Sequence, residues 1–133
     1  MSDMKKMIVF TLLILGMISC SSETEAEIGE YTTIEVDKTY DAGTVAKGEI
    51  IEAKIEIKNT GDFPLVIANV RAACSCTVSE YSEEPVAPGE KAYIYAEVNT
   101  DKTRKGDLSK PITISANTRP TSTEVKIIAK VID

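Results

Sequence analysis

An alternation of apolar and charged residues with a period of two constrains the fold of this 133-residue chain more than any other feature. It is clearest between Ile50 and Asn59, where four apolar residues alternate with four charged ones. The apolar row is Ile51, Ala53, Ile55 and Ile57, and the charged row is Glu52, Lys54, Glu56 and Lys58. Because successive side chains of a β-strand point to opposite faces of a sheet, this pattern predicts a strand with one buried and one solvated face.

Six further segments have the composition of strands, and no helical period competes with them. These segments are Tyr31–Val36, Tyr40–Val45, Leu65–Val70, Ala92–Val98, Ile112–Ala116 and Thr123–Val131. The residues expected to face inward in the last three are Ala92, Ile94, Ala96, Val98, Ile112, Ile114, Ala116, Val125, Ile127, Ala129 and Val131. Glycine and proline fall between the segments, as expected of turns. About seven short, half-buried strands predict an all-β domain, either a β-sandwich or a barrel.

The first twenty residues have the organisation of a bacterial lipoprotein leader. The basic pair Lys5-Lys6 precedes an apolar run from Met7 to Ile18, and the small residue Ser19 stands directly before Cys20. The apolar run is about eight residues short of the roughly 20 that a membrane-spanning helix needs, which favours a cleaved signal over an uncleaved anchor. We therefore expect a signal peptide over residues 1–19 and a lipidated Cys20 at the start of the mature protein.

Residues 20–30 follow the leader as a short polar and acidic segment. Such a composition buries too little surface to order itself, so we expect a tether between the lipid and a single domain of residues 31–133. The tether is either an ordinary linker or a sorting signal, since acidic residues after a lipidated cysteine resemble the surface-export signal of some Gram-negative lipoproteins. Both readings predict a domain outside the cytoplasm, anchored to a bacterial membrane, with the outer membrane favoured and its periplasmic or exposed side left open.

The charge balance argues against nucleic acid as a partner. The whole chain carries 15 basic and 21 acidic residues, a net charge of −6. Loss of Lys5, Lys6 and Asp3 with the leader removes two positive charges and one negative charge, which leaves −7 on the mature protein. Binding to a nucleic-acid backbone or to anionic lipid needs a concentrated basic surface. We expect the basic stretch Lys102–Lys105 to be a solvated hairpin loop instead.

Missing residue types narrow the chemistry further. The chain has no histidine and no tryptophan, and its four methionines all lie in the leader. These absences remove Ser-His-Asp and Cys-His catalysis, histidine-based zinc sites and thioether copper ligands. We therefore expect a protein that is not an enzyme and that carries neither a cofactor nor a metal ion.

Cys74 and Cys76 are the two thiols that remain once Cys20 is acylated, and three readings of the pair stay open. The first is a local disulfide, which an oxidising compartment favours but which requires the backbone to bend, because alternate residues of a strand lie near the upper limit of disulfide geometry. The second is a pair of inert, half-buried thiols. The third is redox exchange or Cu(I) binding, with Arg71 as a nearby positive charge that favours a thiolate.

Tyr93, Tyr95 and Glu97 share the face opposite the inward row of their strand. Two tyrosines on the outside of a sheet form a candidate interaction surface for an envelope protein or a glycan. Cross-strand packing on a partly covered face is the simpler explanation of the same pattern. The absence of tryptophan speaks against carbohydrate stacking.

Three groups of residues together resemble a known bacterial family. They are Tyr40–Val45 with Gly48-Glu49, Lys58–Gly61, and Cys74–Thr77 with Pro85 and Ala87–Glu90. The resemblance covers residues 31–131 and is to the family called domain of unknown function 1573, whose sandwich is related in fold to the Hydin and major-sperm-protein domains. It implies an immunoglobulin-like β-sandwich of about seven strands. Because the family has no established activity, the resemblance says little about function.

Together these observations favour a membrane-anchored, extracytoplasmic and non-enzymatic interaction or structural module of the cell envelope. Lipid on Cys20 would hold the domain at a membrane, and sheet edges, loop ends or the Tyr93/Tyr95 face would offer contact area, with strand addition at an exposed edge as one mode. The alternative is a thiol protein that uses Cys74 and Cys76. Replacement of both cysteines by serine abolishes activity only under the alternative. The oligomeric state is not predicted.

Overall fold

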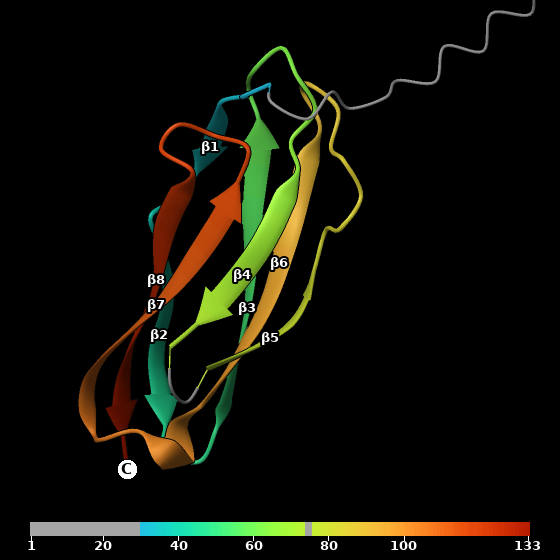
Figure 1. Cartoon of the computed structure of the whole chain (residues 1–133). Helices are drawn as coiled ribbons and strands as arrows, with labels where there is room; N and C mark the ends of the chain where they lie inside the picture. The colour runs from blue at the N-terminus through green and yellow to red at the C-terminus, as the bar shows by residue number, and fades with distance from the viewer. Residues whose placement is uncertain (1–29, 74–75) are drawn as a thin grey trace, which may run out of the picture.

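The structure is a computed structural model that describes residues 30–73 and 76–133, and these residues form eight β-strands and one turn of 3-10 helix (Figure 1). The elements are β1 (Ile34–Val36), β2 (Thr39–Ala46), β3 (Ile50–Asn59), β4 (Ile67–Ala72), β5 (Cys76–Tyr81), β6 (Lys91–Asn99), η1 (Thr100–Lys102), β7 (Gly106–Ala116) and β8 (Ser122–Ile132). Within this part of the chain, no helix is long and apolar enough to cross a membrane.

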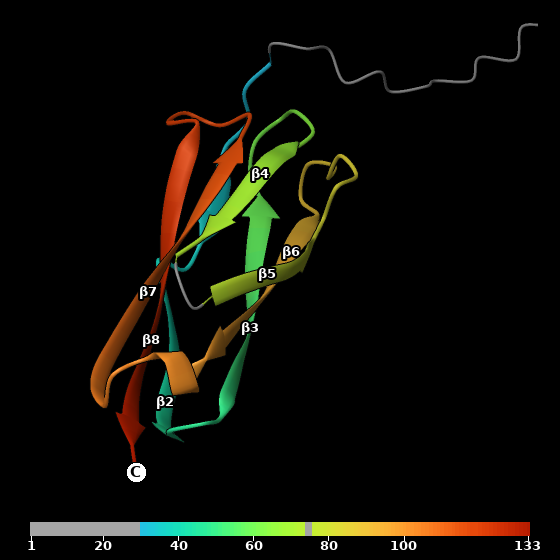
Figure 2. The same ribbon diagram turned by 60° about the horizontal axis from the view of Figure 1, so that its bottom comes forward.

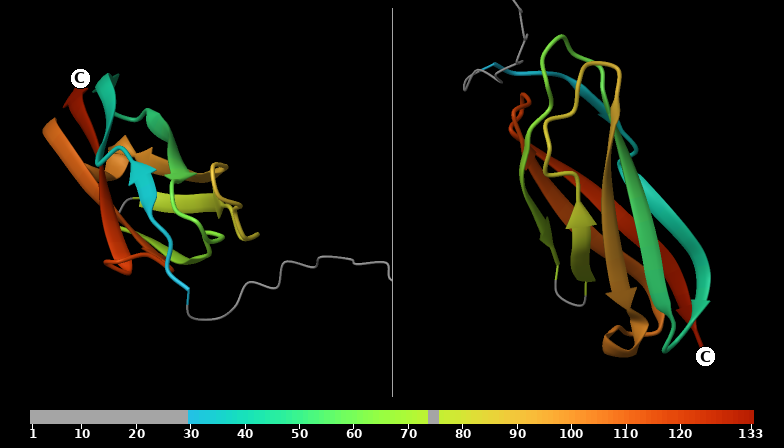
Figure 3. Two further views of the ribbon diagram at one scale, coloured as in Figure 1. Left: turned by 90° about the horizontal axis from the view of Figure 1, so that it is seen from above. Right: turned by 90° about the vertical axis from the view of Figure 1, so that its right-hand side faces the viewer.

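The strands form two four-stranded sheets that pack face to face (Figures 1 and 2). One sheet has the strand order β1-β3-β6-β5, and the other has the order β2-β8-β7-β4. Neighbouring strands are antiparallel except for β2 and β8, which run parallel. Seen along the length of the sandwich, the sheets are separate layers, and β4 and β5 lie side by side at one edge (Figure 3). The predicted all-β sandwich is confirmed.

The core between the sheets consists of the alternating rows that the sequence predicts. The buried rows are Ile51, Ala53, Ile55 and Ile57 on β3, Ala92, Ile94, Ala96 and Val98 on β6, Ile112, Ile114 and Ala116 on β7, and Val125, Ile127, Ala129 and Val131 on β8. Burying each large aliphatic side chain contributes about 1.5–3 kcal/mol before the cost of ordering the chain. The period of two therefore determines which face of each sheet packs inward.

One strand, β5, was not predicted, so the expected seven strands are corrected to eight. Apolar and polar residues do not alternate regularly along β5, and the register of this strand with β6 shifts between Val78 and Glu80. Such a bulge moves the following side chains out of phase with the period of two. Cys76 and Val78 still pack against the core from this strand.

Two predicted strands begin later than expected. β1 begins at Ile34, because Thr32 bridges to Thr118 at the end of the other sheet instead of pairing with β3. β4 begins at Ile67, because Leu65 bridges to Val86 in the β5–β6 connection. In both cases the apolar or β-branched pattern begins before the strand does, because the residues that precede the strand pair with a different segment.

The expectation of a hairpin at Lys102–Lys105 is wrong. This segment joins β6 to β7, which belong to different sheets, so it is a crossover. Its turn is held by Thr103, which is buried and whose hydroxyl donates to the carbonyl of Thr100 at 2.8 Å. The three basic side chains of the segment are exposed, so its solvation is as predicted.

Several predictions fall on parts of the chain outside the described residues. These are the signal peptide of residues 1–19, the lipidated Cys20, nearly all of the tether, and Cys74. They stay predictions.

Candidate interaction face

The outer face of the β1-β3-β6-β5 sheet carries Tyr93, Tyr95 and Glu97. Side chains of β6 alternate between the core and this face, so the three point away from the other sheet. Tyr95 is 38% exposed, Tyr93 is half-buried and Glu97 is exposed. The shared face is as the alternation predicts, while its use as an interaction surface stays a prediction.

Pairing of β6 with β3 adds residues that the sequence analysis did not single out. Lys54 lies opposite Tyr95, and Glu52 lies opposite Glu97. The Lys54 Nζ atom is 4.3 Å from the centre of the Tyr93 ring and 5.7 Å from the centre of the Tyr95 ring. Lys54 therefore makes a cation–π contact, mainly with Tyr93. Only the register of the two strands reveals this contact, because Lys54 and Tyr93 lie far apart in the sequence.

The end of the face beyond Tyr93 is electrostatically balanced. Lys91 Nζ lies 2.7 Å from Glu56 Oε1, and both side chains are about half exposed. The hydrogen bond and the negative charge of Glu56 raise the pKa of Lys91. An exposed pair of this kind adds little to stability. Each of its charges already has a partner, so a ligand would have to compete for it.

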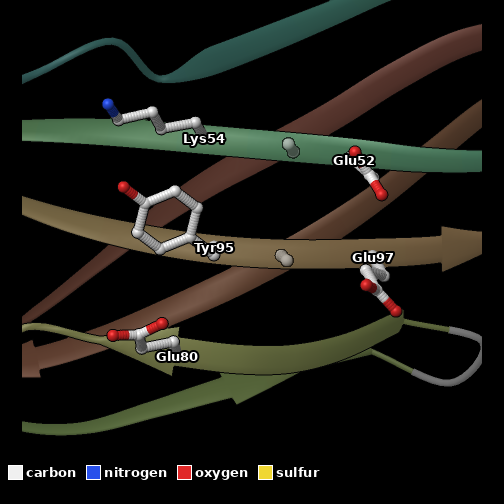
Figure 4. A pocket seen from close by; sticks show the side chains of 7 residues that line it. Glu52, Lys54, Glu80, Tyr95 and Glu97 are labelled. Atoms are coloured by element: carbon white, nitrogen blue, oxygen red, sulfur yellow. The ribbon is translucent and has the colours of Figure 1, made fainter.

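A hollow of about 410 Å³ lies on the other side of Tyr95 (Figure 4). Its walls are Glu52, Lys54, Glu80, Tyr95 and Glu97, which come from β3, β5 and β6. Ala53 and Ala96 turn their side chains to the core, so their backbone forms the floor. Among the described residues, none of the three carboxylates forms an ion pair. The hollow therefore combines an exposed aromatic ring with uncompensated negative charge.

The carboxylates do not form a metal site. Within residues 30–73 and 76–133, no group of three or more aspartate, glutamate or cysteine side chains is close enough to hold a metal ion.

Cys76 lies on β5 with its thiol half-buried against the core. Burial raises the pKa of this thiol, and the positive charge of Lys110 on β7 offsets part of that rise. The cation that acts on Cys76 is Lys110. The suggestion that Arg71 favours a thiolate concerned Cys74, three residues further on, and stays a prediction. The thiol is free among the described residues, and Cys74 lies outside them, so the Cys74–Cys76 disulfide stays a prediction.

The span of the sandwich agrees with a family match. Residues 32–131 match the model of the family described as protein of unknown function (DUF1573). The chain belongs to this family. The matched residues of this DUF1573 protein run from the Thr32 bridge before β1 to Val131, the last buried residue of β8. The resemblance noted in the sequence is confirmed.

Solved structures show the same fold for this DUF1573 domain, although a search of the curated proteins finds no match. A protein of unknown function from Porphyromonas gingivalis W83 is similar with a TM-score of 0.67 and 21% identity, over 84% of this chain and 51% of that one. The PapD-like domain 7 of human CEP192, an ASH/PapD-like domain, has a TM-score of 0.60 and 12% identity, over 88% and 98%. The secreted serine protease VesC from Vibrio cholerae has a TM-score of 0.64 and 14% identity, over 77% and 24%.

These likenesses identify the sandwich as PapD-like and immunoglobulin-like. At such identities they show the fold alone. The DUF1573 chain spans about half the length of the Porphyromonas protein that it matches.

Proposed function

We propose that this DUF1573 protein is a non-enzymatic interaction module of the cell envelope, held at a membrane by lipid on Cys20. Its binding surface is the outer face of the β1-β3-β6-β5 sheet. The observation that carries the proposal is the exposed ring of Tyr95 in the middle of a strand, beside Tyr93 and Lys54. Tyrosine is among the residue types that contribute most to binding at protein interfaces.

Cross-strand packing explains Tyr93 better than Tyr95. Tyr93 is half-buried and has Lys54 over its ring at 4.3 Å, whereas Tyr95 keeps 38% of its surface exposed. Tyr31 and Phe63 are similarly exposed, but they lie outside the strands, Tyr31 before β1 and Phe63 in the β3–β4 connection. Tyr95 differs because flanking strands provide a firm surface around it.

The remaining parts of the proposal rest on the sequence. The lipobox before Cys20 supports the anchor and a location outside the cytoplasm. The absence of histidine supports a role without catalysis. A thiol role for Cys74 and Cys76 is supported less well, because burial raises the pKa of Cys76 and so disfavours the reactive thiolate.

The experiment is photocrosslinking in the bacterium that encodes the protein. A photoreactive phenylalanine derivative replaces Tyr95 in one strain and Thr44, an exposed residue of the opposite sheet, in another. We expect a discrete crosslinked species from position 95 only, and its loss together with membrane attachment in Cys20→Ser. Equal crosslinking at both positions, or none at 95, contradicts the proposal.

A second measurement separates the two kinds of partner. The purified protein is sedimented with isolated peptidoglycan sacculi, and Tyr95→Ala is compared with the parent protein. Cosedimentation that depends on Tyr95 identifies a glycan partner, whereas a crosslinked polypeptide without cosedimentation identifies a protein partner.

A further inference from the structure

We propose that the hollow between Glu52, Tyr95 and Glu97 binds a cationic side chain, best an arginine, presented by a basic segment of a protein partner. This inference rests on the proposed function, because it specifies the partner chemistry of the same face. It is carried by the charge pattern of the face together with the exposed aromatic ring and the shape of the hollow.

The first observation is that Glu52 and Glu97 lie directly opposite each other on β3 and β6. Residues paired in this way have Cβ atoms about 4.5–5.5 Å apart, and like charges at that distance oppose strand pairing. Glu80 lies opposite Tyr95 on the next strand, and Figure 4 shows its carboxylate at the other end of the hollow from Glu52 and Glu97. A bound cation would reduce this repulsion, so the unbound face carries adjacent negative charges that a basic partner would neutralise.

The cation of the hollow itself does not neutralise these carboxylates. Lys54 lines the hollow but its ammonium group lies over the Tyr93 ring, at 4.3 Å. Figure 4 shows the Lys54 ammonium at the opposite end of the hollow from Glu52 and Glu97. The Glu52 and Glu97 carboxylates therefore lie apart from this ammonium group, which already has an aromatic partner, whereas the Glu80 carboxylate lies at the same end of the hollow as Lys54.

The opposite sheet shows that this pattern is not a general result of the acidic composition. A hollow of about 470 Å³ on its outer face contains Asp107, but there Asp107 lies directly opposite Lys130. Asp41, in the same hollow, accepts a hydrogen bond from the Gly43 backbone at 2.8 Å. No aromatic residue lines that hollow. In this hollow each acidic side chain has a cation opposite it or a backbone donor, whereas Glu52 has another carboxylate opposite it.

The chemistry of the walls favours a guanidinium group. It stacks on an aromatic ring and donates paired hydrogen bonds to carboxylates, whereas an ammonium group is compact and strongly hydrated. The hollow is open on a sheet face and holds a side chain rather than an enclosed small molecule, which proteins usually surround on most sides. The occupant is therefore a side chain supported by a partner's backbone.

The test uses the purified mature lipoprotein in detergent and three capped, fluorescent peptides. The peptides are Arg-Ser-Arg-Ser-Arg, the same sequence with lysine, and the same sequence with citrulline, the neutral counterpart of arginine. We expect binding in the order arginine, lysine, citrulline, with an affinity for the arginine peptide that falls as salt rises. Citrulline binding equal to arginine binding overturns the inference, and so does the absence of binding by the arginine peptide.

Two double variants with the same change in net charge locate the site. Glu52→Gln with Glu97→Gln is expected to weaken arginine-peptide binding about tenfold, as the loss of two charge-assisted contacts predicts. Asp41→Asn with Asp107→Asn, on the other sheet, is expected to change it less than about twofold. Equal weakening in both shows attraction to net charge alone and overturns the inference. Thermal unfolding confirms that each variant is folded.

The stacking contact is tested separately. Tyr95→Phe keeps the ring and is expected to bind like the parent, while Tyr95→Ala is expected to lose several-fold in affinity. Equal binding by the two variants contradicts the role of the ring.

Failure of the cationic inference is distinguishable from failure of the proposed function. If the photocrosslink at position 95 persists in Glu52→Gln with Glu97→Gln, the face binds a partner without the carboxylates, and only the cationic inference falls. If position 95 never crosslinks in the parent, the proposed function itself falls.

Discussion

Asn59 Oδ1 accepts a hydrogen bond from Thr32 Oγ1 at 2.7 Å, across 27 residues of sequence, and both side chains are buried. The same amide donates to the carbonyl oxygens of Phe63 at 2.7 Å and Val86 at 2.9 Å, and accepts from the Gly61 backbone at 3.2 Å. One side chain thus joins the segment before β1 to the β3–β4 and β5–β6 connections. Polar contacts of this kind position the loops at that end of the sandwich together with Leu65 and Val86, core residues that lie in the same two connections.

Asn59→Ala should destabilise the domain by about 3 kcal/mol. The substitution leaves buried donors and acceptors without partners, and each such group costs roughly 1–3 kcal/mol. Urea denaturation measures the change. Asn69→Ala, at an exposed position on β4, is the control and should stay within about 0.5 kcal/mol of the parent. A similar loss of stability in both variants would show that the Asn59 contacts contribute no more than an exposed side chain does.

Gly61→Ala should cost about 2 kcal/mol or more, for a steric reason. A β-carbon at position 61 would clash with Thr32 Oγ1 and would lie 2.6 Å from the Thr33 backbone nitrogen. Removing the Thr32 side chain relieves the first clash but not the second, so Thr32→Ala should not rescue Gly61→Ala. The midpoints of thermal unfolding of the single and double variants decide this, and full rescue would show that only the side chain matters.

Cys76 should be alkylated more slowly than an ordinary cysteine at neutral pH. Burial raises the pKa of its thiol, so the midpoint of the pH–rate curve should lie above that of the same protein in urea. Lys110→Gln removes the charge that opposes this rise and should move the midpoint higher still. Iodoacetamide modification of the Cys74→Ser variant isolates Cys76. A midpoint below the urea value would support the thiol alternative.

The same shift predicts how stability depends on pH. Above the ordinary cysteine pKa the unfolded chain releases the Cys76 proton while the folded chain retains it, so stability should fall as pH rises through that range. Comparison of Cys76→Ser with its parent at pH 7 and pH 10 isolates this contribution.

Glu97→Lys should stabilise the domain while it weakens arginine-peptide binding. The substitution places a cation opposite Glu52 and replaces a repulsive pair with an attractive one, a gain of about 0.2–1 kcal/mol. Lys130→Glu, which places two carboxylates opposite each other on the other sheet, should destabilise by a similar amount. Chemical denaturation and peptide titration of both variants test the pair. Loss of stability in Glu97→Lys would contradict the repulsion at this position.

The sequence predicts the sandwich because its rows of isoleucine, valine and alanine share a period of two, which places each row on one face of its strand. It does not predict β5, whose bulge between Val78 and Glu80 breaks that period. Nor does it reveal the contacts of Lys54 with Tyr93 or of Asn59 with Thr32, since these depend on which strands become neighbours. Tyr95 and Glu97 were found from their own strand alone, whereas Glu52 and Glu80 needed the register of three strands.

The position of β8 between β2 and β7 has a consequence for when this domain folds. β8, an inner strand of its sheet, follows the other seven strands of the described residues in sequence, whereas its parallel partner β2 is among the first. Until Ser122–Ile132 has emerged, β2 has no neighbour in its sheet, and pairing between such distant segments is slow. For a protein expected to cross a membrane, this order of strands delays stable folding of the domain until β8 has been synthesised, which would keep the chain unfolded for longer before export.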